Sequence, residues 1–197
     1  MKTVMRVIAV ACLLLGLAGC GTTAKEMRAK SLSERSDIFS GAKTGDAIPE
    51  GYAVLTIRTE IKLPAEGLKV RQAGKNDGYP FLLNIGGQAV LWQAEGIMEK
   101  KPAYDKDGGI SRDPEAGEGL RYTMEKRVQL RSGSHSVFFG LPEDDCFVER
   151  EITLGEGEEA VLEYRPVYRQ KTRPIRVRSF LKGVRDWEVF FKGARIH

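Results

Sequence analysis

The stretch "HSVFFGLPEDDCFVEREITLGEGEEAVLEYRPVY", residues 135–168, decides the fold of this chain. It holds three short runs rich in β-branched and aromatic residues, separated by the clusters "LPEDD" and "GEGEE". β-Branched and aromatic residues favour strands, whereas Gly, Pro and Asp favour tight turns. We therefore expect three successive strands joined by short connections.

Similar β-rich runs separated by turn residues occur upstream of this stretch. Residues 52–63, "YAVLTIRTEIKL", alternate with period two towards their end, and residues 79–93, "YPFLLNIGGQAVLWQ", form two β-rich runs around a Gly-Gly pair. Residues 120–130, "LRYTMEKRVQL", add another run, and no window beyond residue 20 has a long helical period. Short strands separated by turn signals are typical of all-β proteins, so we predict an antiparallel, Ig-like β-sandwich over residues 49–168.

A family resemblance lies within this region. Residues 130–166 resemble the back half of a PEGA-type β-sandwich domain, and the family's Leu-x-x-Gly-x-His-x-Val pattern is matched by Leu130, Gly133, His135 and Val137. "LPAEGLKV", ending at Val70, resembles the front half, although the roughly fifty residues that follow exceed what this small fold normally carries. The resemblance implies a surface or periplasmic interaction module rather than an enzyme.

The C-terminal extension, residues 169–197, contains an internal repeat. "SFLKGVR" at 179–185 recurs as "VFFKGAR" at 189–195. Two copies are too few for a solenoid. We expect a β-meander or hairpin in which "IRVRSFL", "WEVFF" and "ARI" are strands and the Lys-Gly pairs form turns.

The N-terminus predicts export and lipid attachment. Residues 1–19 place Lys2 and Arg6 before an apolar run of about eleven residues, as in a secretory signal, and a membrane-spanning helix needs about twenty. The end of this segment, Leu-Ala-Gly-Cys20, resembles the lipobox of bacterial lipoproteins. The resemblance implies a diacylglyceryl group on the Cys20 thiol, cleavage before it and acylation of the new amine. An ordinary cleavable signal is the alternative.

The next residues indicate the membrane to which the protein is attached and the distance between the lipid and the folded domain. Gly21 stands where the lipoprotein family usually has Asp for inner-membrane retention, so the resemblance implies the outer membrane as part of the cell envelope. Residues 20–48 are polar and small, and we interpret them as a flexible tether with at most a helical turn around residues 24–33. Residues 95–119 read as a long loop, either a flexible excursion or a contact loop.

Charge is distributed unevenly along the mature chain. Residues 165–197 hold ten Lys or Arg against two acidic residues, whereas residues 20–164 hold 19 basic against 25 acidic residues. A basic segment suits anionic lipid, lipopolysaccharide, an acidic envelope protein or the acidic part of this same chain. Nucleic acid also suits basic residues interleaved with aromatic ones, but an exported protein seldom meets any. The candidate contact residues are Arg173, Arg176, Arg178, Lys182, Arg185, Lys192 and Arg195.

The mature chain has too few cysteines for an internal disulfide. Cys12 leaves with the signal and Cys20 carries lipid, so Cys146 is the only thiol of the mature chain. A lone thiol in an oxidising compartment is either buried or available for pairing between chains. The neighbouring Asp144 and Asp145 would raise its pKa, which favours a buried, inert cysteine.

Two further patterns resemble a catalytic pair and a metal site. His135 lies among serines, but strand alternation places it with Val137 and Phe139 and points the flanking serines to the other face, which disfavours a Ser-His pair. The loop acids Asp105, Asp107, Asp113, Glu115 and Glu118 suit Ca²⁺ by type, but an EF-hand aligned on Asp105 has isoleucine where glycine is required. We expect neither metal nor cofactor.

The sequence therefore favours a lipid-anchored cell-envelope protein that acts as a non-catalytic binding or assembly module. Its contacts would be made by the basic tail, the long loop or both. The alternative is a carbohydrate- or peptidoglycan-processing enzyme, which would need two carboxylates that converge in a cleft.

Overall fold

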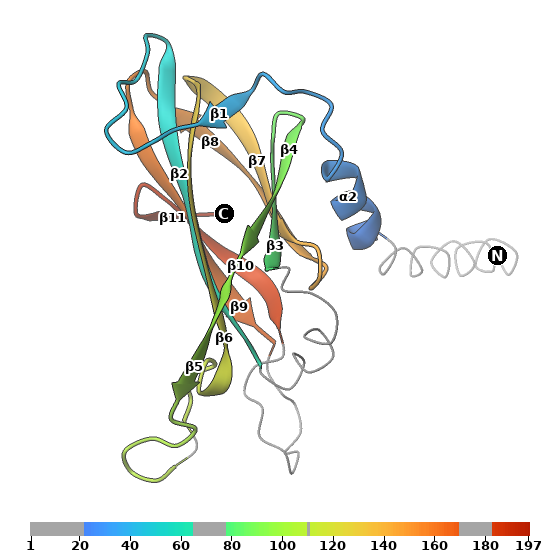
Figure 1. The fold of residues 1–197 in the computed structure, drawn as a ribbon, viewed down its shortest axis with the longest axis vertical. Helices are drawn as coiled ribbons and strands as arrows, with labels where there is room; N and C mark the ends of the chain where they lie inside the picture. The colour runs from blue at the N-terminus through green and yellow to red at the C-terminus, as the bar shows by residue number, and fades with distance from the viewer. Residues whose placement is uncertain (1–21, 65–77, 110, 170–182) are drawn as a thin grey trace, which may run out of the picture.

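The computed structural model describes residues 22–64, 78–109, 111–169 and 183–197. Its described residues form a mostly β fold, 62% of them in strands with one short helix, in which two largely antiparallel sheets pack face to face (Figure 1). The β-sandwich expected from the sequence is confirmed.

The first sheet has seven strands and contains both the first and the last strand of the described chain. Its order is β1 (Phe39–Gly41), β6 (Gly117–Arg131), β2 (Tyr52–Pro64), β9 (Glu159–Tyr168), β10 (Val184–Phe191) and β11 (Ala194–Ile196). β5 (Gly96–Lys101) pairs with the start of β6, off this path. β2 and β9 run parallel, and the other pairs of this sheet are antiparallel.

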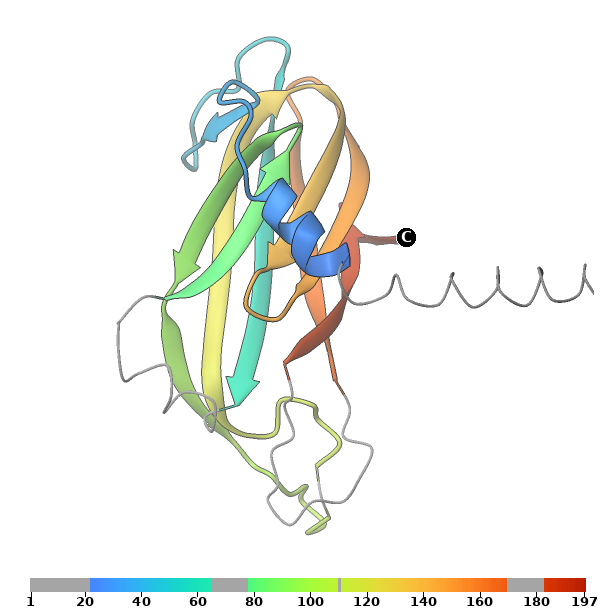
Figure 2. The ribbon, with the colours of Figure 1, turned by 90° about the vertical axis from the view of Figure 1, so that its right-hand side faces the viewer.

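The second sheet has four strands, all paired antiparallel. Its order is β4 (Gln88–Ala94), β3 (Tyr79–Ile85), β7 (Gly133–Leu141) and β8 (Cys146–Leu154). The 90° view shows a helix, α2 (Thr22–Lys30), lying across the outer face of this sheet (Figure 2). The three strands predicted within residues 135–168 are therefore β7, β8 and β9, which span both sheets.

Alternating apolar residues of the two sheets meet in one core. Its centre is aromatic: the ring of Phe139 stacks on Tyr164 with centroids 4.2 Å apart, and Trp187 packs edge-on against Phe139 at 5.3 Å. Offset and edge-on ring pairs add stabilisation beyond the apolar area that they bury. These residues come from β7, β9 and β10. The core therefore joins the second sheet to β9 and β10 of the first sheet.

The predicted C-terminal hairpin is confirmed for β10 and β11. The turn between them is Lys192-Gly193, with φ of 51° and 80°. Two successive residues with positive φ form the type of tight turn that matches the twist of a hairpin. The first strand expected for a meander, "IRVRSFL", lies outside the described residues.

Part of residues 20–48, expected as a flexible tether with a helical turn, packs on the sandwich in the structure. Met27 of α2 is buried against Leu82 and Phe138, and β1 pairs with the end of β6. The side chain of Gln88 also binds the backbone of Phe39. Met27, the partly buried Ile38 and Phe39, and the pairing of β1 with β6 hold this segment. Such widely spaced apolar residues in a polar segment gave no sign of docking in the sequence.

The expected long loop 95–119 is also corrected. β5 occupies residues 96–101 and β6 begins at residue 117, so the connection shortens to residues 102–116. The side chains of β5 are largely exposed, and the strand therefore lacks the apolar alternation by which the others are recognised. Ion pairs described below hold it in place.

Candidate functional site

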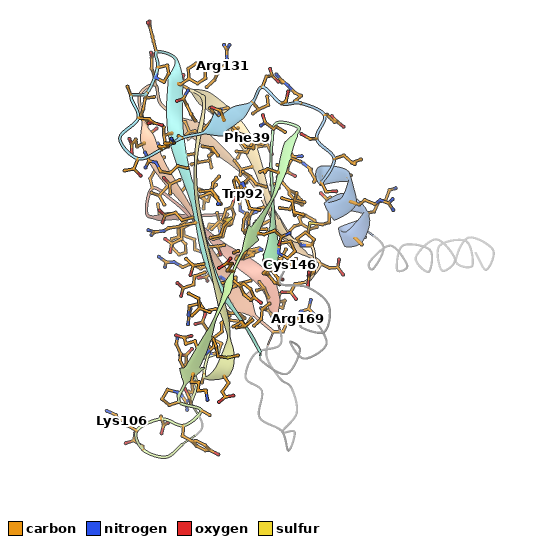
Figure 3. The ribbon with its side chains drawn as sticks, in the orientation of Figure 1. Phe39, Trp92, Lys106, Arg131, Cys146 and Arg169 are labelled. Carbon is orange, nitrogen blue, oxygen red and sulfur yellow. The ribbon has the colours of Figure 1, made fainter. Side chains whose placement is uncertain are left out.

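A dense group of charged side chains lies at one end of the first sheet. There β5 lies against the start of β6, and the connection 102–116 extends beyond the sandwich with Lys106 near its tip (Figure 3). We call residues 96–116 the β5 arm. The base of the arm rests on a group of charged side chains, the ionic cluster, whose members are Glu60, Lys62, Glu99, Lys101, Glu115 and Arg121.

Lys62 of β2 is the most deeply buried member of the ionic cluster. Its side chain has no exposed surface, and its Nζ donates to the carbonyl oxygens of Glu115 and Gly117, both at 2.8 Å. The same Nζ lies 3.3 Å from a carboxylate oxygen of Glu99. A Cβ on Gly119 would lie 2.9 Å from Lys62 Cε, so glycine leaves room for this lysine. A buried ammonium needs such partners, because an unpaired buried charge is strongly destabilising.

Arg121 of β6 binds three carboxylates. Its Nη2 lies 2.5 Å from Glu99 and 2.7 Å from Glu115, and its Nη1 binds Glu60. The hydrogen bond from Arg121 lowers the pKa of Glu99. Burial opposes the ionisation of Glu115, but hydrogen bonds from Tyr168, Arg121 and Lys101 outweigh it and lower the pKa of Glu115 as well. Both carboxylates are therefore ionised at neutral pH.

Tyr168 of β9 ties the ionic cluster to the sandwich. Its hydroxyl donates to Oε1 of Glu115 and accepts from the backbone N–H of Lys62, each at 2.8 Å. Burial, with the nearby Glu115, raises the pKa of this phenol, so it stays a donor. The arm is thus linked by charged hydrogen bonds to β2, β6 and β9.

The arrangement of Glu99 and Glu115 differs from that of a glycoside hydrolase. Such an enzyme needs one carboxyl group that keeps its proton and one that is ionised. Here both carboxylates bind the same guanidinium nitrogen and both pKa values are lowered. This pair is suited to holding the β5 arm in position rather than to proton transfer.

Apolar side chains on the β5 arm face solvent. Ile97 is 73% exposed, Met98 51% and Tyr104 49%. Register places Ile97 opposite Arg121 and Met98 opposite Leu120, so the two side chains emerge on opposite faces of β5. Exposed apolar side chains on an edge strand are typical of contact surfaces.

The predicted basic contact residues do not form one free patch in the described structure. Lys192 pairs with Glu158 at 2.5 Å and Arg195 pairs with Glu188 at 3.1 Å, whereas Arg185 is exposed on β10. The other four candidates, Arg173, Arg176, Arg178 and Lys182, lie outside the described residues, as does Cys20.

The outer face of the first sheet carries two open grooves, of which one is lined in part by Lys192. One, of about 330 Å³, is lined by Arg58, Glu60, Glu163 and Arg165 among others, and another, of about 440 Å³, reaches Phe190. Glu163 binds Arg58 at 2.9 Å and Arg165 at 2.9 Å. These charges therefore neutralise one another, and they create no strong electrostatic potential that would attract a charged ligand.

The other chemical candidates have structural partners. His135 Nε2 lies 2.7 Å from the carbonyl oxygen of Arg131, while Ser134 contacts Thr153 and Ser136 donates to Glu149, so no Ser-His pair forms here. Asp105 accepts from two backbone N–H groups of its own loop. Among the described residues, no three His, Cys, Asp or Glu side chains are grouped as a metal ion would require.

Cys146 is buried, as the sequence predicts. Burial raises the pKa of its thiol to about 12, and the carboxylates of Asp144 and Asp186 add to the effect. The thiolate is the nucleophilic form, so this cysteine is poorly reactive in the folded protein.

Sequence reasoning missed the ionic cluster. Its members come from β2, β5, β6 and the loop between them, and only strand register brings them together. The available signal was Lys62 in an otherwise apolar strand end, "IKLP".

Comparisons with protein-family models, curated proteins and solved structures find no match for this chain. In the part of the chain that the structure describes, no helix is both long and apolar enough to cross a bilayer.

Proposed function

We propose that this protein is a lipid-anchored component of the cell envelope that acts as a non-catalytic binding or assembly module and uses the β5 arm as its main contact surface. The lipobox-like Leu-Ala-Gly-Cys20 supports the anchor and the outer membrane as its location. The PEGA-like pattern in residues 130–166 supports an interaction module.

The observation that carries the proposal is the β5 arm itself. Exposed Ile97 and Met98 lie on a strand whose base is fixed by the fully buried Lys62 and by Arg121. A surface held in one geometry loses less conformational entropy when it binds. The arm therefore combines apolar contact area with preorganisation, which is what a binding surface needs.

The basic tail serves as a second contact in this proposal. Its partner would be anionic lipid, lipopolysaccharide or an acidic envelope protein. Because Lys192 and Arg195 already pair with acids of the domain, the exposed Arg185 and the cations outside the described residues would carry this contact.

Site-specific photo-crosslinking in intact cells tests the main contact. A photoreactive side chain at Ile97 is expected to yield one discrete adduct, because this side chain is exposed on the β5 arm. Thr123, an exposed residue of the neighbouring β6, is the matched control and is expected to yield none. Mass spectrometry of the adduct identifies the partner, including a second copy of this chain. Equal, diffuse crosslinking from both positions would argue against a contact surface on the arm.

A further inference from the structure

We propose that the lipid on Cys20 does more than tether the protein: it seats the sandwich directly against the bilayer, with the outer face of the second sheet towards the membrane. This inference rests on the proposed lipid anchor and concerns what that anchor does to the domain. It replaces the flexible spacer expected from the sequence with a short connection, in which Cys20 stands two residues before the first residue of α2.

Helix α2 is docked on the outer face of the second sheet. Met27 is only 5% exposed and packs with Leu82 and Phe138 of the second sheet in a small cluster separate from the main core. A Cβ on Gly140 would lie 2.8 Å from Met27 Sδ and Cε, so the glycine provides the space that the methionine fills. Burial of this apolar side chain stabilises the docked position of the helix.

Polar contacts fix the C-terminal end of α2. Lys30 Nζ binds Glu149 of β8 at 2.5 Å and lies 5.5 Å above the ring of Phe138. Asn84 of β3 donates to the carbonyl oxygen of Lys30 at 2.8 Å. These contacts reach three strands of the second sheet, β3, β7 and β8, and they restrict rotation of the helix about its C-terminal end.

The length of chain between the lipid and the helix limits their separation. Cys20 and Thr22 are two residues apart, so their Cα atoms lie within about 7 Å of each other whatever the conformation between them. A flexible tether of the length expected from the sequence would instead place the domain roughly 30 Å from its anchor on average. Because α2 is docked, a bilayer that holds the Cys20 lipid must lie close to the second sheet.

The face that this geometry turns towards the membrane carries apolar side chains and nearby cations. Leu91 of β4 is 53% exposed, and register places it beside Leu82 on the same outer face. Leu32, directly after α2, is 65% exposed, and Lys25 and Arg28 of the helix are exposed as well. Apolar side chains with nearby cations suit the interface of a bilayer that contains anionic lipid.

The opposite side of the sandwich then points away from the membrane. The outer face of the first sheet carries the paired Arg58, Glu163 and Arg165, and the β10–β11 hairpin belongs to the same sheet. The long axis of the domain lies along the bilayer, since α2 crosses the side of the sandwich rather than its end (Figures 1 and 2). In this orientation the β10–β11 hairpin lies on the side of the domain that is turned away from the anchoring bilayer.

Depth-dependent fluorescence quenching tests this orientation. The full-length lipidated protein is reconstituted in vesicles of phosphatidylethanolamine and phosphatidylglycerol that contain a quencher on the acyl chains. A fluorophore is attached at Leu91→Cys or at Thr123→Cys, two exposed positions on opposite outer faces. Stacked sheets lie about 10 Å apart, so the two probes differ clearly in depth. Quenching is expected to be several-fold stronger from position 91.

Two further variants show whether α2 sets this orientation. Met27→Asp is expected to release the helix and make the two positions equal, whereas Ala29→Asp, on the exposed side of the same helix, is expected to keep the difference. A flexible insertion of about ten Gly and Ser residues between Gly21 and Thr22 is expected to act like Met27→Asp, because it adds roughly 17 Å of average reach.

The outcomes separate this inference from the proposed function. Lipidated protein with equal quenching at both positions overturns the seated orientation and leaves the anchor intact. Protein that carries no lipid on Cys20 overturns the proposed anchor, and the inference falls with it.

Discussion

Replacing Trp187 by alanine is expected to lower the free energy of unfolding by about 3–5 kcal/mol, a large part of the roughly 5–15 kcal/mol that holds such a domain together. Trp187 is 4% exposed and packs edge-on against both Phe139 and Tyr164 at the centre of the core. Its loss would leave a cavity between the two sheets. Urea denaturation followed by circular dichroism measures the change.

Phe190→Ala is the matched control, because Phe190 lies in the same strand and is only half-buried. It stacks under the guanidinium of Arg165 at 4.0 Å on the outer face of the first sheet. Such an exposed cation–π contact contributes about 0.5–1 kcal/mol. Similarly small losses of unfolding free energy in both variants would mean that β10 is not part of the core and is available for external contacts.

Replacing Arg121 by methionine is expected to release the β5 arm while the sandwich stays folded. The change leaves the carboxylates of Glu99 and Glu115 without their shared partner. Breaking a buried ion pair costs about 3–5 kcal/mol, and the lower end applies here because Arg121 is 17% exposed. Amide hydrogen exchange of residues 96–101 is expected to accelerate by about a hundredfold or more.

Arg58→Met is the control for this variant. Arg58 pairs with Glu163 on the same sheet, but its side chain is 49% exposed, so the loss is expected to stay below about 1 kcal/mol. Unchanged exchange of β5 in Arg121→Met would show that pairing with β6 alone holds the arm, and the ionic cluster would lose its assigned role.

The ionic cluster also gives the arm a defined pH dependence. The pKa values of Glu99 and Glu115 are lower in the folded protein than the ordinary glutamate value of about 4.3. The stabilisation is therefore fully present above that value and is lost as pH falls through the folded pKa values. Protection of β5 amides is expected to be constant between about pH 7 and 5 and to fall below about pH 4. The fall should be smaller in Arg121→Met.

The strands of the sandwich were predictable because their signal is local. Residues 135–168 alternate apolar and polar side chains between clear turn residues, and these became β7, β8 and β9. The Lys192-Gly193 turn was likewise recognisable from its residues. Such features depend on neighbours along the chain and need no knowledge of the tertiary structure.

The docked helix and the ionic cluster depend on contacts between distant residues. Met27 is the one large apolar residue of α2, and its burial follows from the space above Gly140. Lys62 and Glu115 are 53 residues apart, and only the β2–β6 register and the path of the loop bring them together. Local patterns in the sequence carry no information on either contact.

We propose above all that lipid on Cys20 holds the sandwich in the cell envelope. Mass spectrometry of the N-terminal peptide tests it most directly, on protein expressed in a bacterial host and extracted from membranes. The expected peptide begins at Cys20 and carries the mass of a diacylglyceryl group with, in most molecules, a further acyl chain, and Cys20→Ser should abolish this species. A peptide that begins elsewhere, or an unmodified Cys20 in membrane-extracted protein, would contradict the account.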